Sequence, residues 1–290
     1  MSTSRTGSPT PADTTGAAAQ YAVGPAESVD RRWATQGESV AASRHWWDAE
    51  ADDYYEEHRE VLGDAELMWG PEGIYESDLG LLGDVAGQDV LEFGAGAAQG
   101  SRWCARTGAR AVATDISSAM LTRGRALDTD PQTGAPAYVQ CDATRLPFGD
   151  TTFDIVFSAY GALPFVADSE GLLQEVARVL RPGGRLVFSV SHPIRWTLPD
   201  VPGEAGLTVR HSYFDRNAYV EADAAGAATY VEHHRTMGDR VREIVAAGLR
   251  LTDLVEPQWP EGATHEWGGW SRLRGRLVPG TAIFICRRDP

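Results

Sequence analysis

Apolar and polar positions follow two periods along this chain, and the change of period divides it into parts. Residues 1–30 are rich in Ser, Thr, Ala, Gly and Pro and offer little to bury, so we expect a disordered tail. Residues 43–62 carry apolar side chains at helical spacing, and Ser43 is the expected N-cap. A second, short helix is expected at 75–82. Residues 31–88 therefore predict an N-terminal helical cap.

From residue 89 onward, short apolar runs alternate with helical segments. Five strands are expected, at 89–93, 111–114, 137–141, 153–158 and 185–190. The Pro-Gly-Gly sequence at 182–184 ends the helix before the fifth strand. Strands separated by helices pair in parallel with right-handed crossovers, which predicts an α/β fold with a doubly wound, mainly parallel sheet.

Residues 191–234 interrupt this alternation with Pro, Gly, His and aromatic residues, and two short runs at 219–221 and 228–232 indicate a hairpin. We interpret this segment as an insertion after strand five that covers an acceptor. It lies within a domain expected to span residues 89–290.

The alternation then resumes. Thr236 and Asp239 fit a capping box that opens a helix. Runs at 251–255 and 281–286 complete a sheet of seven strands.

The composition removes several classes of chemistry. The chain has 290 residues and no Lys, so all 26 basic residues are Arg. Enzymes that need a lysine Schiff base or the lysine of a Walker-type phosphate loop are excluded. A formal net charge of −15 argues against a nucleic-acid partner, because affinity for phosphates comes largely from clustered cations.

The same sequence argues against metal and membrane sites. Cys104, Cys141 and Cys286 stand far apart, so we expect neither a disulfide framework nor a metal site. No apolar run is long enough to span a bilayer and no secretory signal is evident, so we expect a cytoplasmic protein that does not bind membranes.

Three acidic residues stand where predicted strands end. Glu92 closes the first strand beside Gly94 and Gly96, Asp115 closes the second, and Asp142 follows the third. Ligands of open α/β sheets bind beyond the carboxyl ends of the strands. Glycines let the backbone approach such a ligand, and a carboxylate after the second strand suits the two hydroxyls of a ribose.

With these residues, the chain resembles the class I S-adenosylmethionine-dependent methyltransferases. The matching segments occur in order at residues 90–96, 114–117, 141–143, 153–158 and 180–186. The whole chain is similar to the small-molecule group of that family known as type 11. The resemblance implies S-adenosylmethionine as the cofactor.

The resemblance also implies which residues hold the methionine part of the cofactor. Glu92 and the loop Gly94-Ala95-Gly96 would line it, and Ser158 would lie under the sulfonium end. The family often has a third glycine where this chain has Ala98, a departure that could shift the loop and Glu92.

For the adenosyl part, the resemblance implies four further residues. Asp115 would bind the ribose and Ile116 would pack on the adenine, which Asp142 and Ala143 would flank. Core packing is an equally good interpretation of Ile116.

Methyl transfer from a sulfonium needs mainly proximity and orientation, and a base helps only when the acceptor loses a proton. His192, just after the fifth strand, is our candidate base, and Tyr160, after the fourth, could orient the acceptor. His211, His233 and His234 lie in the insertion, where a structural role is the simpler interpretation.

Aromatic residues at 46, 47, 54, 55 and 69 precede the core, and those at 259, 267 and 270 follow it. They could pack the helices onto the sheet or cover an aromatic acceptor, and the sequence leaves both open. Residues 158–161 lack the Asn-Pro-Pro-Tyr type of motif that accompanies methylation of bases or glutamine side chains in related folds.

The function predicted is methyl transfer from S-adenosylmethionine to a small organic acceptor, at oxygen, nitrogen or carbon. An NAD(P)-linked oxidoreductase is one alternative, although its fingerprint needs glycine where Gln99 stands. A non-catalytic S-adenosylmethionine-binding protein is the other. The sequence does not predict the oligomeric state.

Overall fold

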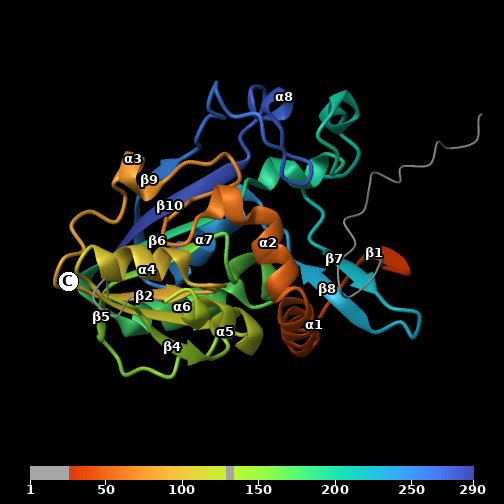
Figure 1. Cartoon of the computed structure of the whole chain (residues 1–290). Helices are drawn as coiled ribbons and strands as arrows, with labels where there is room; N and C mark the ends of the chain where they lie inside the picture. Colours follow the sequence, from red (N-terminus) through yellow and green to blue (C-terminus); the bar gives the residue numbers. More distant parts are fainter. Residues whose placement is uncertain (1–25, 129–133) are drawn as a thin grey trace, which may run out of the picture.

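A computed structural model describes residues 26–128 and 134–290 of the chain (Figure 1). Most of the expected tail lies outside the described residues. The described chain is already ordered at the end of that tail, because strand β1 (Ser28–Arg32) begins two residues before the predicted boundary. Its partner is a strand of the predicted hairpin, more than 180 residues away, so the local sequence gives no sign of it.

The seven-stranded sheet that the pattern predicts is confirmed. Its strands are β2 (Asp89–Phe93), β3 (Arg110–Asp115), β4 (Ala137–Gln140), β5 (Phe153–Ala159), β6 (Leu180–Ser191), β9 (Leu249–Val255) and β10 (Thr281–Arg288). Their order is β4-β3-β2-β5-β6-β10-β9. The first five strands pair in parallel, and β10 runs antiparallel to both of its neighbours. The order reverses at β2, which places the ligand edge of the sheet at the end of that strand.

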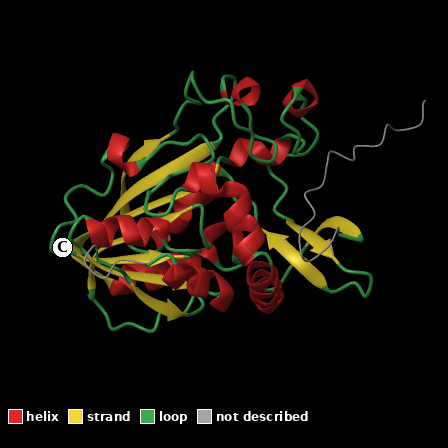
Figure 2. Ribbon diagram, in the orientation of Figure 1, coloured by secondary structure: helices red, strands yellow, loops and turns green. Residues whose placement is uncertain are grey.

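The helices between the strands are α4 (Gln99–Arg106), α5 (Ser118–Ala126), α6 (Ser169–Val179) and α7 (Met237–Ala246). The expected capping box of α7 is present: Asp239 N donates to Thr236 Oγ1, and Thr236 N donates to the Asp239 carboxylate. Figure 2 shows these helices packed against the strands of the sheet.

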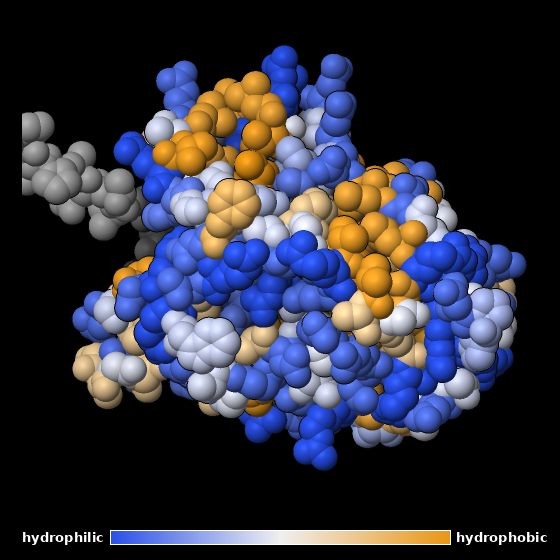
Figure 3. Space-filling model, turned by 180° about the vertical axis from the view of Figure 1, so that it is seen from behind, coloured by the Kyte–Doolittle hydropathy of each residue, from blue (hydrophilic) through white to orange (hydrophobic). Residues whose placement is uncertain are grey.

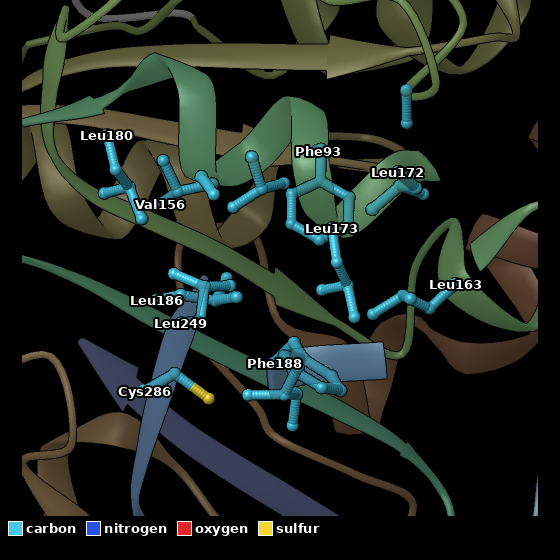
Figure 4. Close-up of a cluster of buried hydrophobic side chains, with 14 of the residues drawn as sticks. Phe93, Val156, Leu163, Leu172, Leu173, Leu180, Leu186, Phe188, Leu249 and Cys286 are labelled. Carbon is cyan, nitrogen blue, oxygen red and sulfur yellow. The ribbon is translucent and has the colours of Figure 1, made fainter. Parts of the chain in front are cut away.

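The two faces of the sheet build two cores. Along β2, Val90 belongs to one cluster and Leu91 to the other, because successive side chains of a strand point to opposite faces. The larger cluster joins β2, β5, β6 and β10 to α6 and includes Phe188 and Leu172 (Figure 4). The smaller one contains Cys104 of α4 and the fully buried Trp69.

The N-terminal cap differs from its prediction. It consists of α1 (Gln36–Ala49), α2 (Ala51–Leu62) and a single helical turn, α3 (Glu76–Leu79). Thr35, not Ser43, caps α1, and its hydroxyl accepts a hydrogen bond from Glu38 N at 3.2 Å. Ser43 is instead a buried residue inside α1. The apolar period begins later than the helix because the first turn of α1 is mostly polar.

The insertion and β1 together form a second small sheet in the order β1-β7-β8, with β7 at Ala218–Ala222 and β8 at Ala228–Glu232 (Figure 1). The predicted hairpin is therefore confirmed. Helix α1 packs against β8. Short helices η2 (Pro193–Thr197), η3 (Glu204–Leu207) and α8 (Arg272–Gly275) complete this side.

Seen from behind, the surface is mostly hydrophilic, with apolar side chains gathered in two areas (Figure 3). Within residues 26–128 and 134–290, no helix is both long and apolar enough to cross a membrane.

The joint between β6 and β10 gives a test of the core. Phe188 and Phe284 are register partners, their rings stack at 4.8 Å, and both are fully buried. Phe284→Ala should lower the free energy of unfolding by about 3–5 kcal/mol in urea denaturation of the whole chain. Val245→Ala, at a side chain that is 64% exposed, should change it by less than about 0.5 kcal/mol. A loss below about 1 kcal/mol at Phe284 would contradict this account of the core.

Candidate functional site

A cavity opens where the sequence predicts it, at the carboxyl ends of β2, β3, β4 and β5. Its floor contains the loop after β2, the end of β3, residues 141–143 after β4 and residues 159–162 after β5. Its cover comes from the other side, where α1 and α2 contribute Val40, Ser43, Trp47, Tyr54, Tyr55 and Leu62. We call α1 and α2 together the lid.

Eight of the eleven predicted site residues line this cavity: Gly94, Ala95, Gly96, Asp115, Ile116, Asp142, Ala143 and Tyr160. Glu92, Ser158 and His192 do not. The insertion, expected to cover the acceptor, supplies no residue of the described lining. The lid lines the cavity instead, and its helix α1 contacts both β8 of the small sheet and α5 of the main domain.

The glycine loop needs its glycines for two different reasons. Gly94 has φ 64°, and a Cβ there would lie 2.3 Å from the backbone nitrogen of Ala162, so only glycine allows the loops after β2 and β5 to touch. Gly96 has φ 54°, and a Cβ there would meet nothing within 4 Å. Gly96 therefore borders open space, which leaves room for a ligand beside its backbone.

Ala98 departs from the three-glycine pattern but not from its geometry. It is fully buried and holds φ 61°, the left-handed conformation that glycine adopts most easily. The loop is therefore kept, and Ala98 carries a steric cost of roughly 1–2 kcal/mol that glycine would avoid.

Asp115 is the buried acid of the cavity wall, whereas Asp142 is half-buried. Asp115 is 8% exposed, its Oδ2 accepts a hydrogen bond from Gly96 N at 2.8 Å, and its Oδ1 accepts one from Ser117 N at 2.8 Å. Burial raises the pKa of the carboxyl, and the backbone donors oppose that rise. The side chain thus joins the glycine loop to the start of α5 at the cavity wall.

The segment after β4 is fixed by its own turn. Asp142 Oδ1 accepts hydrogen bonds from Thr144 N at 2.9 Å and from the Thr144 hydroxyl at 2.8 Å. Cys141 N donates to the backbone oxygen of Asp115 at 3.0 Å, which joins the ends of β3 and β4. Asp115 and Asp142 are the only charged residues of the described lining.

Glu92 lies behind the cavity. Its Oε2 accepts hydrogen bonds from Ser101 N at 2.7 Å and from the Ser101 hydroxyl at 2.5 Å, so it anchors the first turn of α4. Burial raises its pKa to about 7. Glu92 supports the loop from beneath and, in this arrangement, does not contact a ligand directly.

Ser158 is buried in β5, just under the contact between the loops. A Cβ added to Gly161 would lie 2.6 Å from its hydroxyl oxygen, and that oxygen has no hydrogen-bond partner among the described residues. The Ser43 hydroxyl, in the cavity roof, likewise has none there. A polar ligand atom could satisfy the latter directly.

Tyr160 has φ 57°, which is rare for a residue with a side chain and is typical of functional sites. Its hydroxyl lies 3.2 Å from Gly280 O and 3.2 Å from Thr281 Oγ1, and Thr281 donates to Glu72 at 2.5 Å. Burial raises the pKa of Tyr160. Sequence reasoning missed Glu72 and Thr281, because neither belongs to a motif.

The contacts of His192 give no support to its predicted role as a general base. Its Nδ1 accepts from Ile194 N at 3.1 Å, as the cap of η2, and its Nε2 lies 2.7 Å from Glu256 Oε1. Burial lowers its pKa, against the pull of Glu256. Both ring nitrogens are thus engaged in holding the segment after β6.

The other histidines of the insertion are also outside the cavity lining. His233 Nε2 bonds the Ser39 hydroxyl at 2.8 Å, and His234 Nε2 bonds Tyr213 O at 2.8 Å. His211 is exposed. These contacts favour the structural role.

Some of the aromatic residues that precede the sheet pack in the core, and others line the cavity. Trp69 is core, whereas Trp47, Tyr54 and Tyr55 line the cavity. Trp47 meets Tyr54 edge to face at 5.2 Å and Phe165 at 5.7 Å. Phe165, in the segment after β5, was not predicted, because a short apolar run there looks the same as core.

Comparison with known proteins decides the family. The family described as "Methyltransferase domain" matches residues 91–188. Demethylmenaquinone methyltransferase of Mycobacterium sp. (strain JLS) is 45% identical over 212 residues, covering 70% of this chain and 76% of the relative. This chain belongs to the S-adenosylmethionine-dependent methyltransferases. The protein of the same name from Mycobacterium tuberculosis (strain H37Rv) is 45% identical over 207 residues, covering 69% of this chain and 73% of the relative.

A solved structure of a methyltransferase agrees. The S-adenosylmethionine-dependent methyltransferase of Mesorhizobium loti is 27% identical, with a TM-score of 0.59 over 73% of this methyltransferase and 96% of that chain. S-adenosylmethionine is therefore the cofactor. The chain is a methyltransferase and not an oxidoreductase or a non-catalytic binding protein.

The raised pKa of Glu92 predicts a pH effect on stability. Between its usual pKa of 4.5 and about 7, the unfolded chain loses this proton while the folded chain keeps it, so stability falls as pH rises through that window. Glu92→Gln keeps an acceptor oxygen for Ser101 and removes the effect. Its unfolding free energy relative to the unaltered chain should rise by up to about 3 kcal/mol between pH 4.5 and 7 in denaturant titrations. A difference that does not vary with pH would contradict a buried, protonated Glu92.

Proposed function

We propose that this methyltransferase acts on a small organic acceptor with a flat, apolar ring, held between the lid and the segment after β5. The observation that carries the proposal is the aromatic cover of the cavity, where Trp47, Tyr54 and Phe165 meet edge to face. Aromatic side chains bind flat rings well by stacked or edge-to-face contact.

We assign the floor of the cavity to the cofactor. Gly94, Ala95 and Gly96 hold the methionine part, since Gly96 borders open space and backbone N–H groups lie at the start of a helix. Asp115 accepts the ribose hydroxyls, because a carboxylate offers about four acceptor positions and its backbone donors do not use all of them.

The adenine would lie further along the same edge. Ile116 and Ala143 offer apolar surface there, and the turn of Asp142 presents backbone and carboxylate at the end of β4. This placement leaves the lid end of the cavity for the acceptor. Glu92 then acts from beneath, by anchoring the first turn of α4, and Ser158 lies under the loops that both molecules touch.

The mycobacterial relatives named for demethylmenaquinone act, by that name, on a quinone-type ring. A ring of that kind fits the apolar, aromatic cover of this cavity, and we therefore propose a quinol or a similar hydroxylated aromatic ring as the acceptor class. The proposed partner is a small molecule and not a nucleic acid. A cytoplasmic location stays a prediction.

The residues of this chain contribute mainly placement. The cofactor supplies an activated methyl group, and the chain brings the acceptor atom in line with it and excludes water. Tyr160 forms one wall, with its hydroxyl tied to Thr281, and so orients the acceptor by contact. No histidine of the described lining is available as a base.

The cofactor assignment is tested at Asp115. Asp115→Ala should weaken the affinity for S-adenosylhomocysteine at least tenfold in calorimetry, because it removes the ribose contact and releases Gly96 N and Ser117 N. Asp253→Ala, an exposed acid of β9, is the charge-matched control and should bind normally. Unchanged affinity of Asp115→Ala would remove the ribose assignment.

The acceptor assignment is tested at Trp47. With reduced 1,4-naphthoquinone as the probe and S-adenosylhomocysteine formation as the readout, Trp47→Ala should raise the acceptor KM about tenfold, as expected for a lost aromatic contact. Trp33→Ala, at a side chain that is 76% exposed, removes the same group outside the cavity and should leave KM unchanged. No turnover of hydroxylated aromatic probes by the unaltered enzyme would exclude this acceptor class.

A further inference from the structure

One acid of the lid reaches out of it and contacts the cofactor half of the site. Asp48 lies in the last turn of α1, directly after the cavity residue Trp47. Its Oδ1 accepts hydrogen bonds from the Ser117 hydroxyl at 2.7 Å and from Ala119 N at 3.1 Å, at the start of α5. The Ser118 hydroxyl lies 3.5 Å away. This carboxylate oxygen therefore forms one fastening between the lid and α5 of the main domain.

The same serine also holds the ribose acid. Ser117 N donates to Asp115 Oδ1 at 2.8 Å, and Asp115 Oδ2 accepts from Gly96 N at 2.8 Å. A chain of three contacts thus leads from Asp48 through Ser117 and Asp115 to the glycine loop. Asp115 and Ser117 are both buried, at 8% and 0% exposure, so these contacts are shielded from competing water.

A second fastening lies one turn further along α5. The Arg123 guanidinium lies over the ring of Tyr55 at 4.3 Å and 3.6 Å from Asp52, and it also pairs with Glu56. All three partners belong to α2. Arg123 holds the lid against α5, and among the described residues it has no hydrogen bond or ion pair with Asp115, Ser117 or the glycine loop. It therefore fastens the lid without taking part in the contacts that lead to Asp115.

We propose that Asp48 is a positioning residue that couples closure of the lid to cofactor binding. With the lid closed, Asp48 fixes Ser117 and so holds Asp115 in the orientation that receives the ribose. The effect is reciprocal, because a cofactor that binds the fixed form of Asp115 must by the same free energy favour the closed lid. The cover over the acceptor then forms on the complex with cofactor, which makes cofactor first and acceptor second the favoured order of binding. The inference rests on the proposed ribose contact of Asp115.

Two readouts test this coupling in the full chain, with S-adenosylhomocysteine as the probe. The first is its dissociation constant by calorimetry. The second is the rate of trypsin cleavage after Arg44 and Arg59, two exposed arginines of the lid, with and without the probe. In the unaltered protein the probe should slow cleavage at both sites at least fivefold.

Asp48→Ala should bind the probe at least tenfold more weakly and lose the probe-dependent protection of the lid. Asp48→Asn keeps one acceptor oxygen for Ser117 and Ala119, so it should stay within threefold of the unaltered protein in both readouts. Asp53→Ala removes an equally charged but exposed acid from the lid and should change neither. If Asp48→Ala does not fold, Asp48→Glu, whose carboxylate is one methylene further out, should weaken binding at least threefold.

A double variant checks that Asp48 acts through Asp115. In an Asp115→Asn background, Asp48→Ala should weaken binding less than threefold further, because the link has already been altered. Tenfold effects that simply multiply would overturn the coupling, as would normal binding and protection in Asp48→Ala and Asp48→Glu. If the unaltered protein binds the probe but Asp115→Ala binds it equally well, the ribose assignment fails first; if only the Asp48 variants behave normally, the coupling alone fails.

Discussion

The structure depends on one buried carboxylate. Asp115 stands at the end of β3 and accepts backbone hydrogen bonds from two different loops, those that start α4 and α5. A buried acid without such donors would be costly, and loops without the acid would leave their N–H groups unsatisfied. The arrangement therefore fixes both loops at once and leaves the carboxylate with capacity for a further donor. A ligand with two hydroxyls meets a site that is already oriented.

The cavity beside Asp115 has a polar floor and an apolar cover, and the two come from different parts of the chain. The floor comes from consecutive βα units, so its geometry follows from parallel pairing and the switch in strand order at β2. The cover comes from residues that precede the sheet in sequence and reach across it. Its aromatic contacts extend beyond the cavity: His58 stacks on Trp267 at 3.9 Å, which ties the lid to the segment before β10. Burial lowers the pKa of His58 to about 4, in keeping with this apolar contact.

The sequence predicted the residues of the cavity floor much better than those of its cover. Strands buried on both faces are continuous apolar runs, and an acid after such a run falls at the ligand edge by topology alone, which is why Asp115 and Asp142 could be placed. The role of Glu92 could not, because a residue at a strand end points either to the cavity or behind it. The role of His192 as a base stays a prediction: its position after β6 is close to the edge, and its ring nitrogens contact Glu256 and Ile194 N. The sequence left open whether the N-terminal aromatic residues cover the cavity, because a helical apolar pattern does not show which surface it packs on. The small sheet that contacts α1 includes β1, whose pairing with β7 joins segments more than 180 residues apart.

The charge of the cavity lining has a consequence for turnover. Both charged residues of the described lining are acids, and no arginine or histidine stands among them. The methyl donor carries a positive sulfonium that becomes a neutral thioether once the methyl group has left. A negatively charged wall attracts the first form more than the second, most strongly where little water screens it. By Coulomb's law, the spent cofactor is therefore attracted to this wall less strongly than the methyl donor that it replaces.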